Sequence, residues 1–453
     1  FKQKTAYEIR LSLVGSEMCI RDRLDLITID PENDRVAVYL RLEDGTFDLV
    51  ATPEVDMTPT AVAVADIASP FASDDAGAPD GKPDIIVGGD AGEVQIVLGR
   101  NDGQFDPPEQ ELDELETLSI VGIAVGDFDD ASDTSIALLD DFGVYMLCNE
   151  NGTLSACGAE AGIDLDGVPT ELVSGDFDAD ADLDLVVLLG VDQRIVPLFG
   201  TGDATFDVGN SASVAGEAAG ATTVDLAVGR MDGDNTDDLV AVNDANDLQF
   251  LGVVLLGRTN GSFRSQPFVA DFEASAITLA DFDSGSDRAL DAITGYSSGL
   301  ATANLGDGSG ALGDPFTFSG SGQVPAAQAL AAGDLAGDSL PDFIALNTDG
   351  TQMRVLINRS AEPTPTPSMM SGTPATPTIT ATGSVVPTNT PTATPTRTPL
   401  PPTATPTPIP TANYGRCDVQ LGGAFAAIAT GRLDGDGSAD VAVADRDGDR
   451  VLL

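Results

Sequence analysis

Histidine and tryptophan are absent from this chain of 453 residues. Without histidine the sequence lacks the commonest general base and the usual zinc and copper ligand, which excludes Ser-His and Cys-His catalytic arrangements. Lysine and arginine are scarce as well: 21 of them stand against 73 aspartates and glutamates, so the formal net charge is -52. Because phosphate binding requires clustered basic side chains, this composition argues against nucleic acid and anionic membranes as partners.

Cysteines and aromatic residues are also few. The four cysteines, Cys19, Cys148, Cys157 and Cys417, show no CxxC spacing, which excludes a zinc knuckle or a thioredoxin-like motif. Cys148 and Cys157 flank an Asn-Gly turn signal, and a hairpin disulfide would suit an exported protein. The cross-strand register misses by about two residues, however, so the bonded and the unpaired states both stay open. With aromatics at 5%, any core consists of Val, Leu, Ile and Ala, which suits thin packing between sheets.

Aspartate, by contrast, recurs at regular spacing, most clearly over residues 175–184, which lead into the apolar residues 185–189. Loop positions one, three, five, seven and nine are Asp176, Asp178, Asp180, Asp182 and Asp184. Calcium binds six to eight oxygen atoms, and short Asp side chains on alternate residues of a tight loop can supply most of them. An EF-hand would carry Glu at position twelve and continue as a helix, whereas Val187 stands there in a β-branched run. The pattern predicts a calcium loop that leads into a strand; the alternative is an Asx-rich turn that caps the strand.

Related loops recur along the chain. Their position-nine residues are Asp25, Asp84, Ser135, Asp184, Asp238, Asp291 and Asp342. The spacing of about 50 residues is typical of propeller-blade repeats, and it marks seven units before a proline-rich tract. Further candidate calcium ligands, including those of one copy near the C-terminus, are Asp66, Asp80, Asp84, Asp127, Asp129, Asp133, Asp232, Asp234, Asp238, Asp281, Asp283, Asp291, Asp334, Asp338, Asp342, Asp434, Asp436 and Asp440. A polar turn followed by a large apolar residue, as at residues 44–47 and 102–105, is a second marker of each unit.

Several loops depart from the full ligand set. Residues 66–84 contain an expansion of about ten residues, and the loop before Asp291 contains an insertion of about two. Ala131 and Ala336 stand where acids are expected, and Arg230 places a cation at a first ligand position. Because calcium needs most of its oxygen ligands from such a loop, we expect binding to be best at residues 176–184 and weaker or absent elsewhere.

The Gly-Asp-Phe-Asp-x-Asp-x-x-x-Asp-Leu-Val pattern of residues 175–186, repeated in this way, resembles the FG-GAP/VCBS family, whose best-known members form the head of integrin α-subunits. The likeness covers about residues 24–360 and the last 30 or so, with a period that matches propeller repeats. The resemblance implies an all-β fold, a seven-bladed β-propeller of four-stranded blades. It also implies that each Asp loop joins the innermost strand of a blade to the next strand and holds structural Ca²⁺.

The rest of the chain is divided by composition. Residues 1–23 hold five basic residues and no repeat marker, and we interpret them as a non-native leader, with a short native strand as the alternative. Residues 24–360 form the propeller, which starts without its first strand and ends without a fourth strand in its seventh unit. Residues 361–413 are a Pro/Thr-rich linker that extends as polyproline II and is suited to O-glycosylation. Residues 414–453 restart the pattern and are interpreted as a truncated further repeat that begins a second propeller.

These features predict a secreted or cell-surface, non-catalytic protein whose propeller binds a protein or glycan ligand in adhesion; the adhesion role comes from the resemblance alone. We find no membrane-spanning segment in the sequence. One alternative is an exported polysaccharide-acting enzyme, since paired carboxylates can act as acid and base, although nothing singles out one pair. A lectin is another alternative, although tryptophan is absent and the tyrosines occupy different places in their units. A structural surface-layer or stalk component is a third.

Overall fold

The computed structural model describes most of residues 26–358 and three strands nearer the C-terminus. The described ranges are 26–30, 34–41, 47–67, 82–100, 105–106, 110–112, 119–131, 133–150, 153–158, 162–215, 221–244, 252–270, 274–283, 289–318, 326–335, 340–347, 352–358, 414–420, 425–431 and 440–445. The expected leader (1–23) and the expected linker (361–413) lie outside these ranges. Within them every regular element is a β-strand, and no helix is long and apolar enough to cross a membrane.

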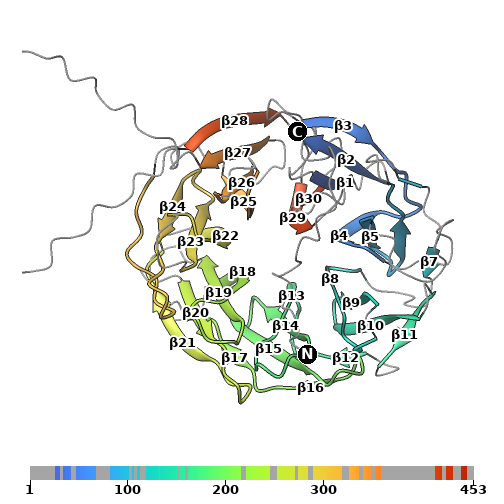
Figure 1. Ribbon diagram of the computed structural model, residues 1–453, viewed down its shortest axis with the longest axis horizontal. Helices are drawn as coiled ribbons and strands as arrows, with labels where there is room; N and C mark the ends of the chain where they lie inside the picture. Colours follow the sequence, from blue (N-terminus) through green and yellow to red (C-terminus); the bar gives the residue numbers. More distant parts are fainter. Residues whose placement is uncertain are drawn as a thin grey trace, which may run out of the picture.

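The strands form seven sheets arranged around a central axis, an all-β architecture of the propeller type (Figure 1). Sheet 1 contains β1 (Leu26–Asp30), β2 (Arg35–Arg41), β3 (Phe47–Ala51), β29 (Phe425–Gly431) and β30 (Asp440–Asp445). Sheet 2 contains β4 (Pro59–Ala65), β5 (Asp84–Gly89), β6 (Val94–Val97) and β7 (Gln110–Leu112). Sheet 3 contains β8 (Gly122–Gly126), β9 (Ser135–Leu139), β10 (Gly143–Glu150), β11 (Thr153–Cys157) and β12 (Ile163–Asp164).

The other four sheets repeat the same antiparallel meander. Sheet 4 contains β13 (Glu171–Gly175), β14 (Asp184–Leu189), β15 (Arg194–Gly200), β16 (Phe206–Val208) and β17 (Ala212–Ser213). Sheet 5 contains β18 (Thr222–Gly229), β19 (Asp238–Asp244), β20 (Gly252–Leu256) and β21 (Arg264–Phe268). Sheet 6 contains β22 (Ala274–Ala280), β23 (Asp291–Tyr296) and β24 (Ala301–Asn304), and sheet 7 contains β25 (Ala327–Gly333), β26 (Asp342–Asn347), β27 (Gln352–Asn358) and β28 (Tyr414–Gln420).

Four-stranded sheets, which the resemblance implied throughout, are therefore common but not universal. Sheets 2, 5 and 7 have four strands, whereas sheet 1 has five and sheets 3 and 4 each add a short fifth strand. Sheet 6 has three strands, and two isolated bridges, Ala303 to Phe316 and Gly306 to Leu312, stand beside its outer edge.

The C-terminal strands pair with strands of the seventh and first sheets. β28 pairs antiparallel with β27 from Gln352–Gln420 to Asn358–Tyr414, and β30 pairs in parallel with β1. The edges expected to lack a partner strand in the seventh and first units are thus covered by β28 and β30, which lie within residues 414–445. The physical reason is that β27 and β1 would otherwise present open sheet edges with unpaired backbone groups, which a further strand satisfies. The assignment of residues 414–453 to a separate propeller does not agree with this pairing.

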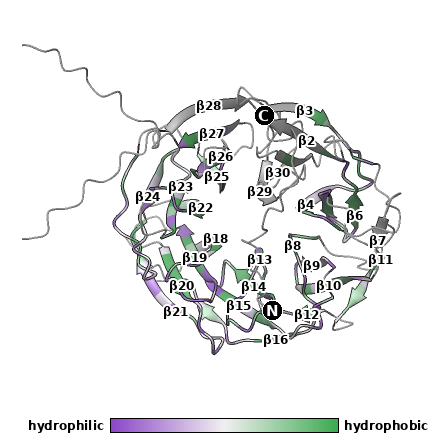
Figure 2. Cartoon of the chain, in the orientation of Figure 1, coloured by the Kyte–Doolittle hydropathy of each residue, from purple (hydrophilic) through white to green (hydrophobic). Residues whose placement is uncertain are grey.

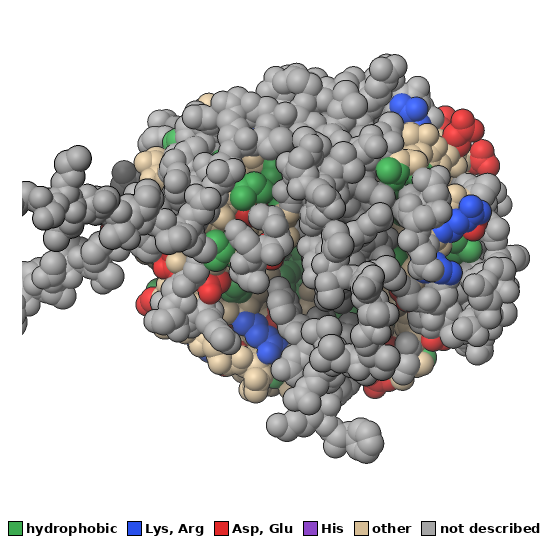
Figure 3. All heavy atoms as spheres, turned by 45° about the horizontal axis from the view of Figure 1, so that its top comes forward, with side chains coloured by type: hydrophobic (Ala, Val, Ile, Leu, Met, Phe, Trp, Pro, Cys, Tyr) green, Lys and Arg blue, Asp and Glu red, His purple; other side chains and the backbone are tan. Residues whose placement is uncertain are grey.

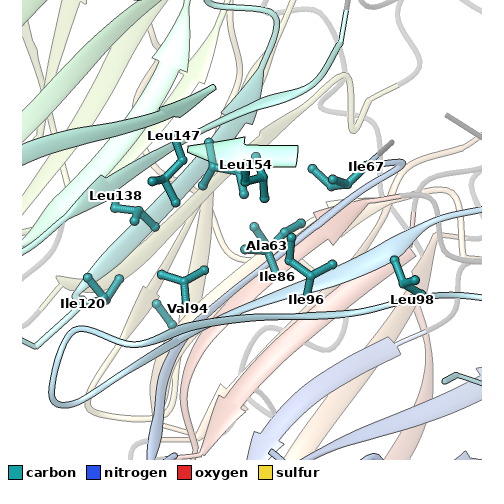
Figure 4. Packing of buried hydrophobic residues seen from close by; sticks show 12 residues of the cluster. Ala63, Ile67, Ile86, Val94, Ile96, Leu98, Ile120, Leu138, Leu147 and Leu154 are labelled. Carbon is teal, nitrogen blue, oxygen red and sulfur yellow. The ribbon is translucent and has the colours of Figure 1, made fainter. Parts of the chain in front are cut away.

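The core lies between neighbouring sheets. Strands β5, β9, β14 and β20 are buried along their whole length, as expected for strands covered on both faces, and they are rich in Val, Ile and Leu. Figure 4 shows one such layer, in which Ile86 and Ile96 of sheet 2 face Leu138 and Leu147 of sheet 3. The hydrophobic colouring follows strands such as β20 in Figure 2. Aliphatic layers of this kind make each sheet depend on its two neighbours.

Cys148 and Cys157 form a disulfide with a Cα–Cα distance of 5.7 Å. The residues directly opposite them are Ser155 and Met146, so the bond runs diagonally between β10 and β11. The two-residue offset expected from the turn is therefore present, and the disulfide spans it.

Candidate metal centre

The candidate ligands lie in the loops that join the first and second strands of the sheets, and each loop takes the number of its sheet. Loop 4 (residues 176–183) joins β13 to β14, loop 5 (230–237) joins β18 to β19, and loop 6 (281–290) joins β22 to β23. Second strands begin at position nine: Asp84 opens β5, Ser135 β9, Asp184 β14, Asp238 β19, Asp291 β23, Asp342 β26 and Asp440 β30. The predicted sequence from acidic loop to strand is confirmed at these sheets.

Two loops bring three carboxylates together. In loop 4 one oxygen each from Asp176, Asp178 and Asp184 lies within 4.8 Å of the others. In loop 6 the equivalent residues, Asp281, Asp283 and Asp291, do the same. Calcium–oxygen bonds of about 2.3–2.6 Å place opposite ligands roughly 5 Å apart. The three oxygens of either cluster are therefore close enough together to form part of one calcium coordination shell. Carboxylate oxygens are the hard donors that Ca²⁺ and Mg²⁺ prefer, and the donor set therefore fits the expected ion.

Local hydrogen bonds give loop 4 its shape. Asp176 Oδ1 accepts the Ala179 N–H at 2.7 Å, and Asp180 Oδ1 accepts the Asp182 N–H at 3.0 Å. Ala179 and Ala181 have φ of 64° and 79°, a left-handed conformation that glycine adopts more easily. These turns bend the backbone so that alternate carboxylates face one another.

The residue at position nine has a second role that the sequence pattern did not reveal. Asp184 is fully buried, and its Oδ2 accepts the Phe177 N–H while its Oδ1 accepts the Gly200 N–H, each at 2.8 Å. Asp238 makes the same two bonds, to Met231 and Gly257, at 2.7 and 2.8 Å. We call this arrangement the position-nine brace, because it ties the loop to the end of the third strand.

The brace also occurs at other sheets. Asp84 accepts the N–H groups of Ile67 and Gly99, and Asp291 accepts those of Phe282 and Gly306. Asp342 Oδ1 accepts the Asn358 N–H at 2.6 Å. The acid at position nine is present even where another ligand position lacks one, as at Ala336 before Asp342, and this was the available sign of a structural role.

The remaining predicted ligands are more dispersed. Asp127, Asp180 and Asp234 are exposed, whereas Asp66, Asp129, Asp133, Asp182, Asp232 and Asp334 are partly buried. Asp80, Asp338, Asp434 and Asp436 lie outside the described residues, as does the side chain of Asp440. Among the described side chains no third group of three acids is as close as those of loops 4 and 6. On the surface in Figure 3, acidic groups appear beside a few basic ones.

Burial governs the electrostatics of the clusters. It raises the pKa of Asp184 and of Asp291 to about 7, although backbone N–H donors oppose the shift. It also raises the pKa of Asp176 and Asp178, and neighbouring carboxylates add to both shifts. A cation bound among these oxygens would offset both the desolvation and the mutual repulsion.

Loop 5 is different because Arg230 occupies its first ligand position. The Arg230 Nε donates to Asp237 Oδ1 at 2.8 Å, so a guanidinium lies beside the acids of this loop. Burial raises the pKa of Asp238 to about 7, as in loops 4 and 6. Loop 5 thus keeps the position-nine brace but has a side-chain cation of its own.

Two carboxyl groups outside the loops were not anticipated. Glu171 of β13 and Asp225 of β18 lie on innermost strands (Figure 1), and the Leu226 N–H donates to Glu171 Oε2 and Asp225 Oδ1, each at 3.1 Å. The Ile277 N–H of sheet 6 donates to Asp225 Oδ2 at 2.7 Å. Burial raises the pKa of both carboxyl groups, and the charge of Asp225 raises that of Glu171 further. Each group links its sheet to the next through a backbone N–H.

Comparison with known proteins supports the resemblance drawn from the loops. Residues 79–130, which include β5 to β8, match the FG-GAP-like repeat family. None of the curated proteins matches the chain.

Solved structures share only low sequence identity with the chain. The periplasmic gluconolactonase PpgL of Pseudomonas aeruginosa is 13% identical over 65% of this chain and 84% of its own, with a TM-score of 0.46. Saccharomyces cerevisiae Sqt1 is 13% identical over 74% and 82%, with a TM-score of 0.44. A protein of unknown function from Desulfotomaculum acetoxidans is 9% identical over 74% and 92%, with a TM-score of 0.49.

Proposed function

Since this chain carries an FG-GAP-like repeat, we propose that it is a calcium-braced, non-catalytic binding protein of the cell exterior. In this proposal the seven sheets are the blades of one propeller, closed by residues 414–445, and the loops of one face bind a protein or glycan in adhesion. Calcium has a structural role. The disulfide between Cys148 and Cys157 supports an oxidising, extracytoplasmic location.

The observation that carries the proposal is the pair of carboxylate clusters at equivalent places in loops 4 and 6. Their acids come from both ends of each loop, so one ion would tie positions one and three to position nine. Position nine is itself bonded to the end of the third strand in both sheets. A bound cation would therefore stiffen the link between the loop and three strands of the sheet, with no reacting group required.

The calcium part is tested by thermal unfolding of the full chain in calcium and in EDTA. We expect chelation to lower the Tm, because ligand binding to the native state stabilises it in proportion to RT ln(1 + [L]/Kd). Magnesium at the same concentration serves as the ion control. A melting curve that is unchanged by EDTA would remove calcium from the account.

The binding part needs separate assays. A glycan array and capture of surface proteins from candidate host cells should identify a ligand, and the bound ligand should be displaced by unlabelled protein. A screen on neutral and acidic polysaccharides, with and without EDTA, should release no product. Calcium-dependent release of sugar would replace the non-catalytic assignment with that of an exported polysaccharide-acting enzyme.

A further inference from the structure

In loops 4, 5 and 6 the residue at position eight contacts the preceding sheet. Leu183 of loop 4 lies against Gly126 at the end of β8, and Leu290 of loop 6 lies against Gly229 at the end of β18. The equivalent residue of loop 5 is Asp237, whose carboxylate lies against Gly175 at the end of β13. A carboxylate therefore replaces an apolar contact between sheets 4 and 5.

Asp237 holds the backbone of Asp176 from both sides. The Asp176 N–H donates to Asp237 Oδ2 at 2.9 Å, and the Asp237 N–H donates to the Asp176 carbonyl oxygen at 2.7 Å. The second oxygen of Asp237 accepts the Arg230 Nε at 2.8 Å. Both side chains of this ion pair are partly buried, with 35% and 21% of their surfaces exposed. We call the Arg230–Asp237 pair with its two bonds to Asp176 the inter-sheet link.

The link acts on the first carboxylate of the loop 4 cluster. Asp176 belongs to sheet 4, yet both its backbone polar groups bond to a residue of sheet 5, which fixes where its side chain leaves the chain. The charges of Arg230 and Asp237 act on the Asp176 carboxyl in opposite directions, the first lowering and the second raising its pKa. The link therefore orients Asp176 and adds no net charge.

We propose that Asp237 is a positioning residue for the loop 4 cation, so that the calcium affinity of sheet 4 depends on sheet 5. This inference rests on the proposed function, because it presumes that loop 4 binds calcium. Residues that orient metal ligands without touching the ion commonly change metal affinity by about 10-fold to 100-fold when they are replaced.

Two double variants of equal charge separate orientation from electrostatics. Arg230→Met with Asp237→Leu removes the ion pair and the acceptor for the Asp176 N–H, and installs the residue type found at Leu183 and Leu290. Arg230→Met with Asp237→Asn removes the same two charges but keeps an oxygen acceptor at that place. Each variant has the net charge of the natural chain, so a difference between them reports the hydrogen bond to Asp176.

Calcium titration calorimetry of the full chain gives the readout. The binding event abolished by Asp178→Asn belongs to loop 4, and the event abolished by Asp283→Asn belongs to loop 6. We expect the leucine variant to weaken the loop 4 event about 10-fold. The asparagine variant should remain within about threefold of the natural chain, and the loop 6 event should be unchanged in both.

Each other outcome has a defined meaning. Equal loop 4 affinity in the leucine and asparagine variants overturns the positioning role, and so does weakening of loops 4 and 6 together, since that indicates general destabilisation. If the natural chain shows no calcium binding, the proposed function fails and this inference fails with it. Circular dichroism melts of both variants check that each is folded at the titration temperature.

Discussion

Sheets 4 and 5 have the same meander and the same position-nine brace. Their loops differ in charge, because both are acidic but only loop 5 contains a basic residue. Loop 4 gathers Asp176, Asp178 and Asp184 without a basic residue of its own, whereas loop 5 pairs Arg230 with Asp237. The brace geometry is nearly identical in the two, with N···O distances of 2.7–2.8 Å. The repeat thus keeps the strand entry through the same backbone hydrogen bonds, while the charged residues around the brace differ between the two loops. In our proposal, this difference determines whether a loop binds an external cation.

The largest effect is expected when the acid at position three is replaced in each of the two loops, Asp178 in loop 4 and Asp232 in loop 5. At a calcium concentration about 100 times the Kd, Asp178→Asn should lose about 2–3 kcal/mol of the stabilisation that binding supplies. In EDTA the same change should raise stability slightly, because it removes one charge from a repelling cluster. Asp232→Asn in loop 5 should show little calcium dependence. Urea unfolding of both variants, in calcium and in EDTA, gives the four free energies of unfolding. An equal calcium dependence of the two variants would contradict the distinction between the loops.

The feature that the two sheets share is tested by Asp238→Asn, which leaves the loop 4 cluster intact. The amide can accept one of the two backbone N–H groups but presents its own N–H to the other, so we expect a loss of about 2 kcal/mol in unfolding free energy. The measurement belongs at pH 8, where a carboxyl group with a pKa of about 7 is ionised. A loss no larger than that of an exposed control, Asp141→Asn, would show that the brace contributes little.

The stability contributed by the contact between Glu171 of sheet 4 and Leu226 of sheet 5 should depend on pH. The folded-state pKa values of Glu171 and Asp225 lie above their ordinary values, so the native state binds more protons than the unfolded state. The stability that they contribute is therefore complete below pH 4 and falls as the pH rises through their folded pKa values. Glu171→Gln, which keeps an acceptor for the Leu226 N–H, should gain about 1 kcal/mol at pH 8 and little at pH 4. Urea unfolding midpoints of the variant and the natural chain between pH 4 and pH 8 measure this gain. A gain that does not change with pH would contradict the prediction.

The smallest effect is expected at sheet 3, where the brace is replaced by a hydroxyl. Ser135 is fully buried, and within the described residues its Oγ has no hydrogen-bond partner. Ser135→Ala removes a buried polar group without a partner, so stability should stay level or rise by up to about 1 kcal/mol. The same urea assay measures it. A loss comparable to that of Asp238→Asn would mean that serine substitutes for the brace.

The repeat pattern predicted local structure well because its determinants are local. Alternating acids followed by β-branched residues located the strand entries at Asp184, Asp238 and Asp291, and the clustering of positions one, three and nine was found in loops 4 and 6. The spacing did not show that position nine bonds to the third strand, because that partner lies 15 to 19 residues away and is a backbone group.

Contacts between neighbouring sheets could not be predicted from the repeat pattern for a related reason. The position-eight acid Asp237 and the inner-strand acid Glu171 act on neighbouring sheets, and their partners are N–H groups that leave no trace in residue identity. The sequence could not place residues 414–445 for the same reason: a repeat signature predicts that a strand forms, but not which open sheet edge it joins.

The seam between sheets 7 and 1 sets an order of events during synthesis. Leu26 pairs with Val441 and Val355 with Cys417, so residues that are far apart in the sequence pair at this seam. The ribosome must synthesise residues 414–445 before these pairs can form, and until then the edges of β1 and β27 remain available to other chains. The nascent protein is therefore most vulnerable to aggregation before residues 414–445 emerge, and a chaperone that covered those edges would act at that stage.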